Sequence, residues 1–330
     1  MWSVRLQFLF WRLIKSVVVL LAVVVLNFTV LRLAPGDPAL VLAGEQGAAD
    51  AAFVDQIRAD FGLDRSIPEQ LGIYIRSLAT FDLGLSFREQ RPISQIIGER
   101  LPATLLLTLT ALAVSLLIGI PLGALAARRP HRALDVALTT ISTAFFAMPL
   151  FWTGLLAIIL FSVWLNWLPS YGMVTVGIPA GGLAELLDVL WHLTLPALTL
   201  ALFYVAIYLR VTRAAVIEVI GSDFVRTARA TGLPAARIWR QHILRNALLP
   251  VITFASLQAG HLIGGSIIVE TVFAWPGIGR LAFDALLQRD YNLLLSIFFA
   301  SSVIVMVFNL LADSLYAFVD PRIDAGPAPA

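Results

Sequence analysis

Five long stretches of this chain contain no Asp, Glu, Lys or Arg, and they limit what it can fold into more than any other feature. They cover residues 101–127, 136–165, 189–209, 246–269 and 291–312. About 20 apolar residues in a helix cross the ~30 Å hydrocarbon core of a membrane. Backbone inside lipid must satisfy its own hydrogen bonds, as a helix does. We therefore expect each stretch to be a transmembrane helix.

A sixth apolar stretch lies near the N-terminus, from Phe8 to Leu31, with Arg12 and Lys15 on its early turns. A signal peptide is the alternative, but no small-x-small cleavage site follows. We expect a retained first helix, and hence an all-α polytopic membrane protein with six transmembrane helices. The composition agrees, because 59% of the residues are hydrophobic and 13% are charged, against roughly 25% charged in soluble domains.

The chain lacks residues that several classes of function require. The chain has no Cys, which excludes disulfides and thiolate catalysis, and its four scattered His do not form a metal site. Lys15 is the only lysine, and Ile14 stands where a phosphate-binding P-loop requires Gly. ATP energy must therefore come from another polypeptide. Neither H-E-x-x-H nor G-x-S-x-G occurs, so we expect no enzyme, no metal and no cofactor in this chain. A net charge of only +2 argues against nucleic acid as a partner.

Basic residues set the expected orientation, because they concentrate in cytoplasmic segments. With a cytoplasmic N-terminus, the inner segments hold Arg5, Arg12, Lys15, Arg128, Arg129, Arg132, Arg210, Arg213, Arg226, Arg229, Arg237, Arg240, Arg245 and Arg322. The short outer loops hold only Arg280 and Arg289. Both termini are therefore expected in the cytoplasm, together with His131 and His242.

The loop 32–100 is expected to be a helical extracytoplasmic cap. Three apolar sets have helical spacing: Phe53, Val54, Ile57 and Phe61 before Gly62; Leu71, Tyr74, Ile75 and Leu78; and Ile93, Ile96 and Ile97 after Pro92. The cap either packs only on its own helices or serves as a docking platform for a solute receptor.

The segment 210–247, between the fourth and fifth spans, is basic and has a helical pattern. The pattern of the fourth span continues to Ile220 and ends at Gly221. Ser222 or Asp223 can cap a new short helix, DFVRTARA. Gly232 then ends this helix, and Pro234 suits the first turn of another that runs into the fifth span.

The residue types of the short helix suit contact with a partner. Ala228 and Gly232 are small, so that another surface can approach the backbone closely. Asp223 lies at the positive end of the helix, and Arg226 and Arg229 can hold carboxylates or phosphates. The alternative is an interfacial helix that binds only anionic lipid.

The run R-T-A-R-A-x-G at 226–232, followed by H-x-L-R-N-A-L-L-P at 242–250, resembles the coupling loop of ABC-importer permeases of the dipeptide/oligopeptide/nickel branch. Arg226 and Thr227 stand where the general motif has Glu and Ala, and its Leu-Pro is displaced to residues 249–250. Eight further motifs match in order: RLAPGDPA (32–39), FGLD (61–64), FDLGLSF (81–87), RLPATL (100–105), FFAMPLFWTGLL (145–156), ETVFAWPGIGR (270–280), RDY (289–291) and LLADSLYAFVDPRI (310–323).

The resemblance covers essentially the whole chain and implies a division into four parts. These are a first helix (1–31), the cap (32–100), a permease core (101–320) and a tail (321–330). It also implies a prokaryotic inner membrane and an ATPase-coupling site made of Ser222, Asp223, Arg226, Thr227, Ala228, Arg229 and Gly232.

The partners implied are a second homologous permease, two ATPase subunits that bind ATP and magnesium, an extracytoplasmic substrate-binding protein, and membrane lipid. The cargo implied is di- or oligopeptides, with nickel or a nickel chelate as the alternative. A self-sufficient secondary transporter or channel is the rival class. It would need ion-coupling carboxylates in mid-membrane, and the central parts of the spans contain none.

Candidates for the translocation path or gate lie in and between the spans. His261 lies in the fifth stretch and either lines the path or bonds a neighbouring helix. The turn Trp275-Pro276-Gly277 suits either a gate or an aromatic interface anchor. Pro149 permits a kink in the third span.

Other features of the spans have a mainly structural interpretation. Pro196 permits a kink in the fourth span, and Gly119-x-x-x-Gly123 lets another helix pack closely. His192 is expected at the membrane interface, and Asp313 is expected to pair with an inner Arg.

Overall fold

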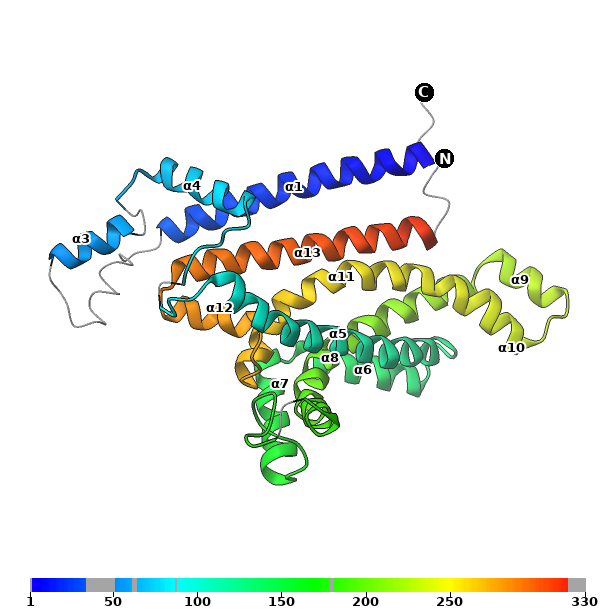
Figure 1. Ribbon diagram of the computed structural model, residues 1–330. Coiled ribbons are helices and arrows are strands. Elements are labelled where there is room, and N and C mark those ends of the chain that lie inside the picture. The colour runs from blue at the N-terminus through cyan, green and yellow to red at the C-terminus, as the bar shows by residue number, and fades with distance from the viewer. Residues whose placement is uncertain (1, 34–50, 61–63, 87, 179–180, 320–330) are drawn as a thin grey trace. The chain divides into compact units, whose positions relative to one another are not determined.

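The structure, a computed structural model, describes residues 2–33, 51–60, 64–86, 88–178 and 181–319. Across these ranges the chain is helical, and its β-type pairing consists of one isolated bridge between Leu85 and Pro92 (Figure 1). The expected all-α class is therefore confirmed.

The helices follow one another along the chain, with two π-helical segments labelled η. Their bounds are α1 Trp2–Leu33, α3 Ala51–Asp60, α4 Ile67–Ala79, α5 Ile93–Ala127, α6 Ala133–Ala147, α7 Leu150–Ala157, η1 Ile158–Trp164, α8 Leu183–Ile220, α9 Asp223–Ala230, α10 Ala235–Arg237, η2 Ile238–Leu244, α11 Arg245–Val272, α12 Ile278–Leu287 and α13 Tyr291–Val319. They pack as two compact units. Unit 1 is Met1–Pro102 with Gly277–Val307, and unit 2 is Ala103–Pro276 with Phe308–Ala330.

Four helical stretches are long and apolar enough to cross a membrane: Phe10–Leu31, Ile93–Ala127, Leu183–Ile220 and Tyr291–Leu311. The bent pair α6 and α7–η1 makes a fifth if it is counted as one span. A multi-pass membrane protein is thus confirmed, whereas the count of six stays a prediction. Its remaining member would be α11, a continuous helix of 28 residues.

The single helix expected over 136–165 is instead broken into two pieces bent by 101°. The break lies at Met148 and Pro149, whose ψ angles of 135° and 134° are extended. A residue before proline is disfavoured in the α region, and proline lacks the N–H that would continue the helix. Pro196, by contrast, lies inside the uninterrupted α8.

In unit 1, the α3 and α4 segments expected for the cap are helices, and Leu78 of α4 is buried. The third apolar set does not form a separate helix, because α5 runs without a break from Ile93 into the span. Ile93 and Ile96 pack in one cluster with Ile278 of α12 and Leu294 of α13. Residues 34–50 and 61–63, which include positions 34–39 of the RLAPGDPA motif and Gly62, lie outside the described part.

In unit 2, α8 is the central helix and packs against α11, α6 and α7. The small-residue motif of α5 lets α5 approach α8 closely. A Cβ atom at Gly123 would lie 2.5 Å from the carbonyl oxygen of Leu209, and one at Gly119 would lie 2.8 Å from Cβ of Tyr208. The helix that packs on this motif is therefore a neighbour within the chain.

Several hydroxyl groups on the long helices of unit 2 are satisfied on their own helix. Thr108 donates a hydrogen bond to the carbonyl of Thr104 (2.8 Å), and Thr199 donates one to that of Leu195 (2.9 Å). Thr271 does the same to Ile267 (2.8 Å). Such bonds use an acceptor four residues earlier on the same helix, so that no neighbouring helix is needed.

Candidate functional site

The short helix α9 forms where the sequence predicts it, over Asp223–Ala230. α8 ends at Ile220, and Ser222 adopts an extended conformation (ψ 152°) before the new helix begins. Gly232 has φ +76°, the left-handed conformation that favours glycine, and it ends the helix. The expected cap is not formed by a side chain, because the Ser222 hydroxyl instead donates to the carbonyl of Val219 (2.6 Å).

One face of α9 is buried against α8 and η2. Val225 and Ala228 are buried in a cluster with Val216 of α8 and with Ile238 and Ile243 of η2. Ala228 therefore does not offer an open backbone to a partner, contrary to the expectation from its size. At Gly232 the expectation of open space holds, since no heavy atom lies within 4 Å of a Cβ atom built there.

The opposite face of α9 is exposed and mixes charge with one large apolar side chain. Arg226 Nη1 lies 3.2 Å from Asp223 Oδ1, and both side chains are largely exposed, as are Thr227 and Arg229. Phe224 is 46% exposed. Sequence reasoning missed Phe224, although it falls outside the buried stripe of Val225 and Ala228 and was visible on that ground. An exposed aromatic side chain beside exposed charged side chains suits a protein contact surface.

Short connections join α9 to two long helices. Gly221 and Ser222 separate it from α8, while α10, η2 and α11 continue as one helical path from Ala235. Figure 1 shows α9 beside α10, at the end of α8 and α11. The Arg128 guanidinium lies 4.8 Å from the centre of the Trp239 ring, which ties η2 to the segment after α5. A displacement of α9 therefore acts on α8 and α11 together.

An ion pair with a buried carboxylate and a partly exposed guanidinium connects α8 to α6 close to the α9 end of α8. Arg213 Nε lies 2.5 Å from Asp135 Oδ1, and Nη2 donates to Oδ2 at 2.8 Å. The backbone N–H of His131 also donates to Oδ2 (2.8 Å). Two parallel bonds from one guanidinium fix the start of α6 against α8.

The gate candidates are only partly brought together. Trp275 is fully buried, and its Nε1 donates to the carbonyl of Ala103 (2.8 Å), so the alternative of an aromatic interface anchor is wrong. Pro276 is half-buried, and Gly277 is the residue before α12. His261 belongs to α11, but its side chain lies outside the described part.

Pro149 is exposed, and the helix that follows it leads to the same region as Trp275. α7 packs through Gly154, where a Cβ atom would lie 3.2 Å from Val272 and 3.3 Å from Phe273. Pro149 therefore lies directly before the helix that packs against the end of α11, although Pro149 itself is exposed.

A buried carboxylate next to Trp275 was missed from the sequence. Glu270 is 0% exposed, and its Oε1 accepts hydrogen bonds from Thr104 (2.8 Å) and Ser266 (3.0 Å). The charge-free stretch ends at residue 269, directly before Glu270, whereas α11 continues to Val272. Glu270 and Trp275 together fasten the end of α11 to residues 103–104 of α5.

His192 is also placed differently from the expectation, because it is buried and not interfacial. Its Nδ1 lies 2.9 Å from the carbonyl oxygen of Asp188 and 3.5 Å from that residue's Oδ1. Asp188 accepts from the backbone N–H (2.6 Å) and hydroxyl (2.8 Å) of Thr175. Among the described residues, no three His, Asp or Glu side chains gather as a metal site would require.

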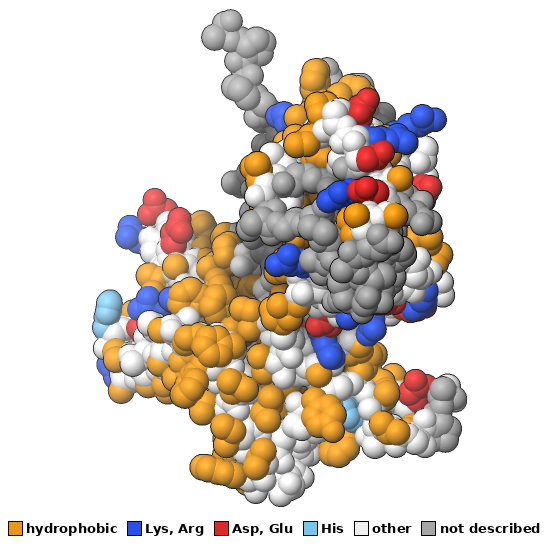
Figure 2. All heavy atoms as spheres, turned by 90° about the vertical axis from the view of Figure 1, so that its left-hand side faces the viewer, with side chains coloured by type: hydrophobic (Ala, Val, Ile, Leu, Met, Phe, Trp, Pro, Cys, Tyr) orange, Lys and Arg blue, Asp and Glu red, His pale blue; other side chains and the backbone are white. Residues whose placement is uncertain are grey.

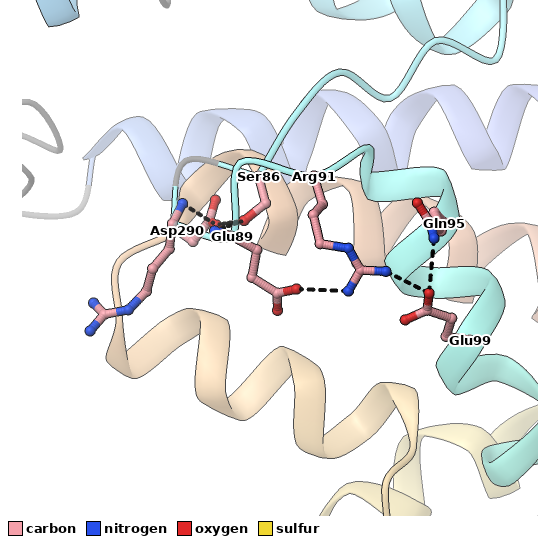
Figure 3. Close-up of polar contacts among 7 residues, drawn as sticks. Ser86, Glu89, Arg91, Gln95, Glu99 and Asp290 are labelled. Atoms are coloured by element: carbon pink, nitrogen blue, oxygen red, sulfur yellow. Dashed lines mark hydrogen bonds and ion pairs between the residues drawn. The ribbon is translucent and has the colours of Figure 1, made fainter.

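In unit 1, two motifs that are far apart in the sequence meet in one polar network (Figure 3). Ser86 of FDLGLSF donates to Asp290 of RDY at 2.5 Å, and both residues are buried. Arg91 lies between Glu89 (3.5 Å) and Glu99 (2.5 Å). The network fixes the loop before α5 on the residue that precedes α13.

Within unit 1, the cap helix α4 contacts α13 and α1. The Tyr74 hydroxyl donates to the carbonyl of Leu295 (3.1 Å), and burial raises the pKa of this hydroxyl above its usual value. The Tyr74 ring stacks on Phe28 of α1 at 5.9 Å. At the start of α4, the Ser66 hydroxyl donates to Glu69 and lowers the pKa of its carboxyl group.

Comparison with known families gives two matches that together cover most of the chain. Residues 119–325 match the family described as binding-protein-dependent transport system inner membrane component. Residues 5–108 match the family model of the N-terminal part of such membrane components.

Similar proteins cover nearly the full length. The oligopeptide transport system permease protein AppB of Bacillus subtilis is 40% identical over 95% of this chain and 98% of its own. The dipeptide transport system permease protein DppB of Escherichia coli K12 is 35% identical over 96% and 98%.

Solved structures share the fold at low identity. An inward-facing MetNI methionine ABC transporter aligns with a TM-score of 0.57 and 18% identity, over 70% of this chain and 99% of that one. An amino acid ABC transporter aligns with a TM-score of 0.51 and 17% identity, over 68% and 94%.

Proposed function

The chain belongs to the family of binding-protein-dependent transport system inner membrane components, and on this basis we propose that it is a permease subunit of an ATP-driven peptide importer. In this role it forms half of the translocation pore. Peptides are the favoured cargo because full-length relatives carry the names oligopeptide and dipeptide permease. Nickel, the alternative from the sequence, has no such support.

The energy source in this proposal is a separate ATPase that docks on α9. The chain has no P-loop of its own, since its only lysine, Lys15, lacks the required glycine context. One chain contributes one coupling loop. Two ATPase subunits, which bind ATP and magnesium, therefore require a second, homologous permease. An extracytoplasmic binding protein delivers the peptide.

The observation that carries the proposal is the two-faced build of α9. Its inner face is anchored through Val225 and Ala228, whereas Phe224 and Arg226 on its outer face are exposed. A helix that only connected two spans would have no need for a rigidly mounted, exposed aromatic side chain. A docking helix needs an anchored inner face as well as an exposed outer face, because a loosely held helix would not transmit the motion of its partner to the other helices.

The path of that motion follows from the connections. A push on α9 acts on α8 through Gly221 and on α11 through η2, and the buried cluster around Val225 keeps all three elements in contact. The far end of α11 is fastened to α5 through Glu270 and Trp275. In this proposal, the movement of the ATPase therefore displaces the core helices of unit 2 together.

The proposed location is the prokaryotic inner membrane, with α9 and both termini in the cytoplasm. The arginines of 210–245 support this side, because basic residues concentrate in cytoplasmic loops.

The test compares two exposed phenylalanines in the complete importer reconstituted in liposomes. Phe224→Ala is expected to lower both co-purification of the ATPase and ATP-driven peptide uptake. Phe81→Ala is the matched control, since Phe81 is also exposed (77%) but lies on the predicted opposite side of the membrane. Normal ATPase binding and uptake by Phe224→Ala would refute docking through α9. Peptide uptake by this chain alone, driven by an ion gradient, would instead support the secondary-transporter class.

A further inference from the structure

A second exposed surface lies far from α9. It consists of residues 150–176, which comprise α7, η1 and the loop that follows, and we call it the aromatic arm. No Asp, Glu, Lys, Arg or His occurs between Asp135 and Glu185. The arm exposes large apolar side chains over its whole length, among them Phe151, Trp152, Val163, Trp164, Trp167 and Tyr171.

The direction of the arm differs from that of a spanning helix. α7–η1 is bent by 101° from α6. If α6 runs across the bilayer, α7–η1 runs along its plane. The arm also precedes Leu183, whereas α9 follows Ile220, and 38 residues of helix lie between them. Since such a helix is about 57 Å long, the arm belongs to the membrane face opposite α9.

The loop of the arm is held in place and is not a loose tail. The backbone N–H of Gly172 donates to the carbonyl of Phe273 (2.9 Å), and Trp191 Nε1 donates to the carbonyl of Trp167 (3.0 Å). Thr175 is held by its two bonds to Asp188. The exposure of the aromatic side chains is therefore built into the fold.

In this region a carboxylate is buried and large apolar side chains are exposed, which is the reverse of a loop in water. Asp188, the carboxylate that bonds the arm, is buried at 7% exposure and satisfied by Thr175, while Val176 is 100% exposed and Trp164 is 73% exposed. Exposing apolar side chains to water costs roughly 25 cal/mol per Å². The aromatic arm must therefore be covered in the working protein.

We propose that the aromatic arm lies in the lipid leaflet opposite α9, with Trp164, Trp167 and Tyr171 at the boundary between acyl chains and headgroups. Trp and Tyr combine an apolar ring with a polar tip, and they are enriched at this depth of the bilayer. A soluble binding protein is a poor occupant, because protein interfaces carry a polar rim and the arm has no charged side chain.

The surface around the arm supports lipid as its partner. Figure 2 shows hydrophobic side chains, interspersed with white atoms, over much of the lower part of the molecule, where Figure 1 places α7. Most charged side chains lie elsewhere in that view, and a carboxylate and a histidine are visible at the lower right. Lipid that covers the exposed face of α6 and the start of α8 thus continues over the arm.

The absence of cysteine makes the test direct, because a single introduced cysteine carries the only label in this chain. We would place a nitroxide at Val163→Cys and at Val176→Cys in the assembled importer, with the cysteines of the other subunits replaced by serine, in lipid nanodiscs. Collision with oxygen, which partitions into lipid, is compared with collision with a water-soluble nickel chelate. Gln288→Cys is the control, since Gln288 is exposed at the end of α12.

Labels in the arm are expected to collide with the nickel chelate roughly fivefold less than the Gln288 label, and to collide readily with oxygen, because polar solutes are excluded from hydrocarbon. Nickel access at residue 176 equal to that at 288 would overturn the proposal and place the loop in water. Labels shielded from both reagents would also overturn it, since they would place a protein subunit over the arm.

Discussion

Arg213 of α8 holds Asp135 of α6 through two parallel hydrogen bonds of 2.5 and 2.8 Å, and the Asp135 side chain is only 3% exposed. The pair lies close to the segment that leads into α9. A guanidinium and a carboxylate in this arrangement resist both sliding and rotation, because each oxygen has its own donor. The start of α6 is thereby fixed to the helix that receives the proposed ATPase stroke.

Loss of this pair is expected to destabilise the protein. Asp135→Asn leaves Arg213 half-paired and should cost about 2 kcal/mol, less than for a fully buried pair because Arg213 is partly exposed. The control is Asp223→Asn, which removes an Asp–Arg pair with a 95% exposed carboxylate and should change stability by less than about 0.5 kcal/mol. The thermal-denaturation midpoint in detergent checks both. Equal midpoints for the two variants would contradict the bracing role.

Close approach of α5 and α8 predicts that Gly123→Ala is harmful. The added Cβ atom would lie 2.5 Å from the carbonyl oxygen of Leu209, so that the helices must separate. We expect a loss of about 2 kcal/mol from overpacking. Gly98→Ala on the same helix meets nothing within 4 Å and should stabilise by about 0.5 kcal/mol through helix propensity. The same denaturation assay distinguishes them, and a stabilised Gly123→Ala would refute the close contact.

Two tryptophans that donate to carbonyl groups should respond differently to replacement by Phe. Trp275→Phe leaves the buried carbonyl of Ala103 without this donor, and we expect a loss of about 2 kcal/mol. Trp191→Phe frees the carbonyl of Trp167 at an exposed site and should cost less than about 1 kcal/mol. A smaller midpoint shift for Trp275→Phe than for Trp191→Phe would show that the indole bond does not fasten α11.

Substitution of Gly232 should separate folding from coupling. The Cβ atom of Gly232→Val meets no heavy atom within 4 Å, but a β-branched residue at φ +76° is strained by about 1–2 kcal/mol. The importer should assemble, whereas ATP-driven uptake should fall strongly. Gly232→Asn tolerates the left-handed conformation and should retain more activity. Uptake and membrane content are measured together, and normal uptake by Gly232→Val would count against docking at this turn.

The helices around α9 were predictable because their signals are local. The end of α8 at Ile220, the bounds of α9 and the turn at Gly232 each follow from a glycine, a cap position or an apolar stripe within a few residues. The break at Pro149 was only half-predictable. Proline permits a kink, but a bend of 101° depends on what α7 packs against.

The polar partnerships could not be predicted, since nothing local marks them. Asp135 and Arg213 are 78 residues apart, and Ser86 and Asp290 are 204 apart. From the sequence, Arg213 indicates only the expected cytoplasmic side and not its partner Asp135. The burial of His192, which the sequence places at the interface, could not be predicted either. It depends on Asp188 and on a loop that has no helical periodicity.

The hydroxyl bonds within the helices have a consequence for how the protein is made. Thr108 and Thr199 each satisfy their hydroxyl on their own helix, so these two groups need no neighbouring helix when α5 and α8 enter the membrane. Glu270 is different, because one of its donors is Thr104 of α5. Thr104 is synthesised 166 residues before Glu270. The hydrogen-bond donor on α5 is therefore already present when the Glu270 carboxylate of α11 enters the membrane.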